Sequence, residues 1–190
     1  MEARAQGLLE QLDVHIIPVP VDKIARALGA RLFYSPLDEE LSGMVYIKDG
    51  VPIIGVNSLH HINRQRFTVA HEVAHLQLHR DYITQAVHVD KRFSESMLRR
   101  DAVSATGTQR LEIEANQFAA ALLIPRASLE EVLSSTELDV EDERALEDLA
   151  RKFKVSKATL QYRIRNIAGE MTQAPRQSAT RPAHVRDPGD

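Results

Sequence analysis

Residues 64–75 read RQRFTVAHEVAH, and they contain the pattern HEVAH at positions 71–75. Residues four apart lie one turn apart on the same face of an α-helix, so the imidazoles of His71 and His75 can converge on one metal ion. Glu72 leaves such a helix about 100° round from His71, where its carboxylate can reach a water molecule without binding the metal. The pattern therefore predicts two metal ligands and a general base.

The residues around this pattern predict a long buried helix over 59–78, with Asn57 and Ser58 as the source of its N-cap. A histidine pair on a buried helix needs partners, and a metal ion is the simplest partner. The alternative, a surface helix with two ordinary histidines, fits the apolar flank poorly. His79 continues the histidine stripe by one more turn. Since a fourth ligand would close the site, we expect a polar supporting role for it. The apolar residues that predict burial of this helix are Phe67, Val69, Ala70, Val73, Ala74, Leu76 and Leu78.

A catalytic zinc site needs a third protein ligand and one open position. The chain has no cysteine, so the third ligand must be a histidine or a carboxylate. A second periodic helix, predicted from Thr108 to just before Pro125, offers Glu112 and Glu114. These two side chains lie about 200° apart round a helix, so both cannot face one ion, and the spacing leaves the choice open. Asn116 lies one turn after Glu112 and could donate a hydrogen bond beside a ligating carboxylate.

Two blocks of sequence are informative together: RFTVAHEVAH at 66–75 and EIEANQFAAALLIP at 112–125. They resemble the ImmA/IrrE family of metallopeptidases, whose members show RFTxAHExxH and, downstream, ExEANxFAxxLLxP. The resemblance covers about residues 14–130. It implies a gluzincin-like site in which His71, His75 and Glu112 hold one divalent metal, zinc or alternatively manganese, and Glu72 is the general base.

The rest of the chain predicts an α+β fold, with a zincin-like core of a small antiparallel sheet and two metal-bearing helices. Strands at 43–48 and 51–56 around Asp49-Gly50 form a hairpin, and Pro52 indicates an edge or a strand start. In zincins an edge strand commonly pairs with an extended substrate. We therefore take the hairpin from Gly43 to Val56 as the candidate substrate-binding strand region. Residues 80–106 are expected to form a long connection of uncertain shape.

The C-terminal part has the outline of a helix-turn-helix, with helices at 142–153 and 156–167. Residues 151–165 hold six basic and no acidic residues, which favours contact with DNA phosphates. The acidic run at 137–148 would oppose this on the same face. The alternative is a helical module that binds protein or only packs. The candidate nucleic-acid residues are Lys157, Gln161, Arg163 and Arg165.

Length and composition set the remaining expectations. The 190 residues suit one domain with a small appendage: a metallopeptidase domain at 1–135, the helical module at 140–170 and a disordered tail at 171–190. The net charge of −3 gives no overall attraction to nucleic acid. The longest apolar run, residues 118–124, is too short to span a bilayer, and residues 1–12 lack a signal-peptide core. We expect a cytoplasmic protein with no membrane partner.

The resemblance implies a function as well as a site. It points to a metal-dependent endopeptidase whose substrate is a helix-turn-helix transcriptional repressor, in a stress-response, mobile-element or phage circuit. One alternative is a non-catalytic, metal-stabilised regulator that binds DNA or a partner, in which Glu72 would be dispensable. A second alternative is one component of a toxin–antitoxin pair.

Overall fold

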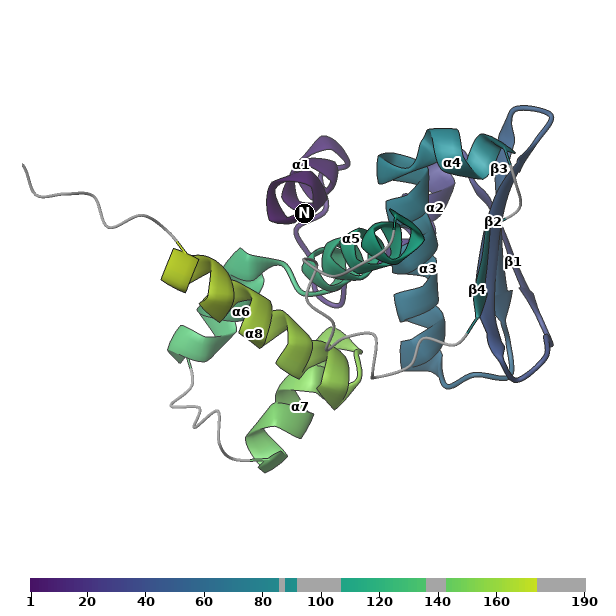
Figure 1. Ribbon diagram of the computed structural model, residues 1–190. Coiled ribbons are helices and arrows are strands. Elements are labelled where there is room, and N and C mark those ends of the chain that lie inside the picture. The colour runs from purple at the N-terminus through teal and green to yellow at the C-terminus, as the bar shows by residue number, and fades with distance from the viewer. Residues whose placement is uncertain (86–87, 92–106, 136–142, 174–190) are drawn as a thin grey trace, which may run out of the picture.

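The computed structural model describes residues 1–85, 88–91, 107–135 and 143–173. Its sheet lies at one side of the molecule, with the helix at Ile62–Leu78 beside it and the helices from residue 107 onward beyond that helix (Figure 1). The elements in chain order are α1 (Glu2–Gln11), α2 (Val21–Ala27), β1 (Arg31–Ser35), β2 (Leu41–Lys48), β3 (Val51–Asn57), α3 (Ile62–Leu78), α4 (Arg80–Gln85), β4 (His88–Lys91), α5 (Gly107–Leu123), α6 (Arg126–Ser135), α7 (Glu143–Phe153) and α8 (Lys157–Gln173).

The sheet is mixed, with the strand order β1-β3-β2-β4. β2 pairs antiparallel with both β3 and β4, but β1 pairs parallel with β3, from Arg31 opposite Ile53 to Ser35 opposite Asn57. The expectation of an antiparallel sheet is therefore wrong for β1. That strand lies beside β3 instead of beside β2, the strand that follows it in the chain. The α+β class itself is confirmed.

The predicted hairpin is present. Asp49 and Gly50 have φ values of 52° and 78°, the left-handed conformation that a tight two-residue connection requires. Pro52 pairs with Ile47 near the start of β3, which is an interior strand. The expectation that Pro52 lies at the start of a strand is therefore confirmed, and the expectation that it lies on an edge strand is wrong.

The metal-motif helix begins later than expected. α3 starts at Ile62, and its N-cap is His61, whose Nδ1 accepts a hydrogen bond from the backbone N–H of Asn63 at 3.2 Å. The side chain of Asn57 is buried and is used elsewhere: its amide donates to the carbonyl of Leu41 at 2.8 Å, and its Oδ1 accepts from the N–H of Leu59 at 3.0 Å. Asn57 therefore fixes the loops on either side of it and does not cap the helix.

α3 lies between the sheet and α5, and this sandwich positions the site (Figure 1). The sheet face against it carries buried side chains of Val45, Ile54 and Val56. On the other side α5 contributes Phe118 and Leu122, both fully buried. A buried side chain of this size contributes about 1.5–3 kcal/mol to folding, so the burial of α3 is strongly favoured.

The C-terminal helices share the same hydrophobic core. Phe153 of α7 and Leu160 of α8 are fully buried and belong to one apolar cluster with α3 and α5. Ser156 caps α8 as expected, because its Oγ accepts a hydrogen bond from the N–H of Thr159 at 3.0 Å. The turn between α7 and α8 is held by α3: Asn63 donates to the carbonyl of Val155 at 3.0 Å.

Some expectations fall partly or wholly outside the described residues. The predicted long connection contains α4 and β4, while its remainder at 86–87 and 92–106 is not described. The boundary between the two predicted domains, at 136–142, and the tail at 174–190 are likewise not described. The division into domains therefore stays a prediction. Among the described residues, no helix combines the length and apolar character needed to cross a bilayer.

Candidate metal centre

Three side chains from two helices meet in the interior. Nε2 of His71 and Nε2 of His75, both on α3, lie 3.0 Å apart. Oε2 of Glu112, on α5, lies 3.2 Å from the first nitrogen, and its Oε1 lies 3.5 Å from the second. Both histidines are at most 1% exposed and Glu112 is 9% exposed, so all three side chains are largely shielded from solvent.

This donor set fits a divalent metal. The ligand atoms of these three residues lie within 4.8 Å of one another. With bond lengths of about 2.0–2.1 Å, ligand atoms on a tetrahedral zinc ion lie about 3.3 Å apart, and the observed separations scatter around that value. Two imidazoles and one carboxylate are also ligand types that zinc accepts in sites with an open fourth position.

Glu112 is held in the charged form that binds metals. Burial alone would raise the pKa of its carboxyl group. Hydrogen bonds and charge attraction from His71 and His75 outweigh burial and hold that pKa well below its usual range. The group is therefore a carboxylate over the whole physiological pH range.

Asn116 forms a hydrogen bond with a ligand histidine, whereas the sequence predicted a hydrogen bond beside the ligating carboxylate. Its Oδ1 lies 2.8 Å from Nδ1 of His71. Because Nε2 of His71 faces the centre, Nδ1 carries the proton and donates to Asn116. The two side chains lie on different helices, so the contact also fixes α5 against α3.

Glu114 does not reach the centre. Its Oε2 lies 3.2 Å from Nε2 of His79, and its Oε1 accepts a hydrogen bond from Nε of Arg110 at 2.9 Å. Burial raises the pKa of Glu114. Hydrogen bonds and charge attraction from Arg110 and His79 lower this pKa by more than burial raises it, so the net shift is downward. Only one of the two neighbouring carboxylates faces the histidine pair, as their angular separation on α5 predicts.

Glu72 lies against the sheet, at a place that the sequence did not reveal. It is fully buried, and a Cβ on Gly43 of β2 would lie 3.2 Å from its Oε1. The same Cβ would overlap Cγ2 of Thr68 and lie 2.9 Å from the carbonyl oxygen of Gly55. Gly43 is thus the residue that lets β2 approach the turn of α3 that carries Thr68 and Glu72. A glycine in a strand can indicate such a close approach, and this was the available signal.

The predicted substrate strand needs correction. β3 lies between β1 and β2, and β2 lies between β3 and β4, so neither strand of the hairpin is an edge of the described sheet. β4 pairs with β2 from Leu41 to Val45, the part of β2 that faces Glu72. Among the described strands the edges are β1 and β4, and a substrate strand cannot pair with β2 there while β4 is in place.

The candidate nucleic-acid residues do not form one surface. Arg163 is 2% exposed: its Nε donates to the carbonyl of Ile124 at 2.9 Å and one terminal nitrogen donates to Glu2 at 2.6 Å. The prediction that it contacts DNA is wrong, because its donors are used inside the protein. Nζ of Lys157 lies 3.6 Å from carboxylates of both Glu143 and Glu147. Gln161 is half-buried and Arg165 is exposed, and their role stays a prediction.

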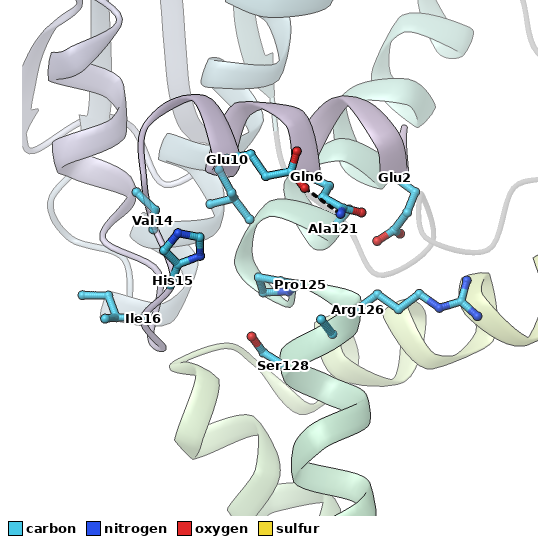
Figure 2. A pocket seen from close by; sticks show the side chains of 12 residues that line it. Glu2, Gln6, Glu10, Val14, His15, Ile16, Ala121, Pro125, Arg126 and Ser128 are labelled. Atoms are coloured by element: carbon cyan, nitrogen blue, oxygen red, sulfur yellow. Dashed lines mark hydrogen bonds between the residues drawn. The ribbon is translucent and has the colours of Figure 1, made fainter.

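A separate cavity of about 250 Å³ lies between α1, residues 14–16 and the junction of α5 with α6 (Figure 2). Its charged groups already have partners: Glu10 accepts a hydrogen bond from Gln6, and Arg126 donates to Glu130. Ala121 in its wall is nine residues after Glu112, about 13 Å further along α5. This cavity is therefore distinct from the histidine–glutamate centre.

A family model described as the IrrE N-terminal-like domain, Peptidase_M78, matches residues 25–165. The match covers well over half of the chain. The chain belongs to this family. The resemblance in the two sequence blocks is thereby confirmed, and an IrrE-like domain of the metallopeptidase type agrees with the donor set at His71, His75 and Glu112.

The fold of this IrrE-like chain has a counterpart of known structure, a Mycobacterium tuberculosis transcriptional regulator. The two share 18% sequence identity with a TM-score of 0.60, over 93% of this chain and 48% of that one. The likeness shows a common fold. The IrrE-like chain spans about half the length of that regulator. No protein of curated function matches the chain.

Proposed function

We propose that this protein is a zinc-dependent endopeptidase. The observation that carries the proposal is the convergence of His71, His75 and Glu112 within 4.8 Å, next in sequence to a buried Glu72. A zinc ion held by these three residues supplies Lewis-acid chemistry, which polarises a carbonyl group and makes water nucleophilic near neutral pH.

The protein's own groups have separate tasks in this proposal. Glu72 takes the proton of the attacking water and later delivers it to the leaving amine of the peptide. Its burial against Gly43 keeps the carboxylate from turning into solvent. Asn116 orients the ring of His71 by accepting its Nδ1 proton.

We further propose that the substrate is a helix-turn-helix transcriptional repressor in a stress-response, mobile-element or phage circuit. Membership of the IrrE N-terminal-like family supports this, and the chain's structural counterpart is itself described as a transcriptional regulator. The resident metal is proposed to be zinc, since its preference for nitrogen and oxygen ligands in a three-ligand site matches the residues present.

The test compares the wild type with Glu72→Gln, both loaded with zinc, on a proteome-derived peptide library. New amino termini are read by mass spectrometry. Wild type should cleave a narrow set of peptides, whereas the variant should bind one zinc ion and cleave none. Equal cleavage by both proteins, or no cleavage by a zinc-loaded wild type, would contradict the proposal.

A further inference from the structure

A chain of polar contacts leads away from His75 on the side opposite the metal centre. Nδ1 of His75 lies 3.1 Å from Nδ1 of His79, which is one turn later, at the C-cap of α3. Nε2 of His79 lies 3.2 Å from Oε2 of Glu114 on α5, and Arg110 holds the other oxygen of that carboxylate at 2.9 Å. The contacts join the end of α3 to the start of α5.

The positions of the protons in this row of contacts follow from its carboxylate end. At one end the carboxylate of Glu114 can only accept, so Nε2 of His79 carries a proton and donates it. With a single proton on its ring, His79 then has a lone pair on Nδ1, which can only accept. The hydrogen that lies between the two Nδ1 atoms therefore belongs to His75. With its proton on Nδ1, His75 presents the lone pair of Nε2 to the centre, and this is the form that binds a metal.

We propose that His79 and Glu114 are positioning residues that hold His75 in its metal-binding tautomer. The inference rests on the proposed function only in taking His75 as a metal ligand. It gives the two ligand histidines matching support, because His71 donates its Nδ1 proton to Asn116 in the same way. With a metal bound, each imidazole then keeps its proton on Nδ1, against a fixed acceptor, and turns the lone pair of Nε2 toward the ion.

The burial of these groups makes the arrangement specific. The side chains of His75 and His79 are 0% and 4% exposed, whereas that of Glu114 is 23% exposed. An unpaired ring N–H at His75 could not be satisfied by bulk water, so loss of its acceptor would favour rotation of the ring or the wrong tautomer. Glu114 sits at the outer end, where Arg110 restrains it.

Zinc affinity tests the inference on four proteins: wild type, His79→Leu, His79→Asn and His15→Leu. Affinity is measured by competition with a chromophoric chelator, independently of any peptidase activity. His79→Leu removes the acceptor and should raise the Kd for zinc by about 10–100-fold. His79→Asn places its amide oxygen Oδ1 where Nδ1 of His79 lies, so it can still accept the proton of His75 and should recover most of the loss. His15 is an exposed histidine away from the centre, so its replacement should have no effect.

Two results would overturn the inference: equal losses of affinity in the leucine and asparagine variants, or no loss in either. If the leucine variant does not fold, nitrogen-15 NMR of the wild-type histidine rings gives the answer. The proposal requires protons on Nδ1 of His75 and on Nε2 of His79, and a proton on Nδ1 of His79 would refute it. If the wild type binds no zinc, the proposed function fails, while the tautomer of His79 still tests the contact chain in the metal-free protein.

Discussion

Oε2 of Glu112 lies 3.2 Å from Nε2 of His71, which brings residues from two separate helices to one point. The contact depends on how α5 crosses α3, because neither helix alone carries three ligands. Buried side chains such as Phe118 on α5 and Val73 on α3 belong to the core in which these helices pack. The geometry of the centre is therefore set by core packing as well as by the metal-binding motif.

Asn116 should matter for metal affinity although it is not a ligand. Replacing it with leucine, which is similar in size, removes the acceptor of the His71 Nδ1 proton. We expect the Kd for zinc to rise about 10–100-fold in isothermal titration calorimetry. Asn116→Asp is the matched control, because it keeps an acceptor and should retain affinity. A leucine variant within about twofold of wild type would show that this contact is not needed.

Gly43 should not tolerate a side chain. A Cβ there would overlap Cγ2 of Thr68 and crowd both Glu72 and the carbonyl of Gly55. We expect Gly43→Ala to lower the free energy of unfolding by about 1–3 kcal/mol in urea. Thr68→Ser removes the overlapping methyl group and should recover part of this loss.

Gly7 provides the control for that experiment. It lies within α1, and a Cβ there would meet nothing within 4 Å. Gly7→Ala should therefore stabilise the protein by about 0.5–1 kcal/mol. Similar changes in both alanine variants would contradict the close approach of β2 to α3.

Arg163 should stabilise the fold and have no part in nucleic-acid binding. Arg163→Met leaves the carbonyl of Ile124 and the carboxylate of Glu2 without this donor. We expect a loss of about 2–3 kcal/mol in urea unfolding, below the 3–5 kcal/mol of a fully buried pair, because Glu2 is partly exposed. The exposed neighbour Arg165 serves as control, and Arg165→Met should change stability by less than about 0.5 kcal/mol. Equal effects would place Arg163 on the surface.

The local parts of the site could be predicted from sequence. The spacing of His71 and His75 fixes their common helix face, and this depends only on the geometry of one helix. The hairpin at Asp49-Gly50 was predictable for the same reason, since its turn residues act locally. The extent of the periodic helix α5 was also close to the expected range.

The remaining features depend on contacts between distant residues. Spacing alone could not choose between Glu112 and Glu114, because the choice depends on the rotation of α5 against α3. The parallel pairing of β1 with β3 and the addition of β4 beside β2 are long-range pairings with no local signal. The prediction that Arg163 is exposed and contacts DNA was wrong for two reasons. An arginine in a basic segment is usually exposed, and its partner Glu2 lies at the other end of the chain.

The central claim is that His71, His75 and Glu112 hold one metal ion, and zinc stoichiometry tests it most directly. Wild type, Glu112→Ala and Glu114→Ala are dialysed side by side against the same concentration of free zinc, one high enough to saturate Glu114→Ala, and the bound metal is measured by plasma mass spectrometry. We predict about one zinc ion per chain in the wild type and in Glu114→Ala, which loses affinity but no ligand, and none in Glu112→Ala. A wild type that binds no zinc, or full binding by Glu112→Ala, would contradict the account.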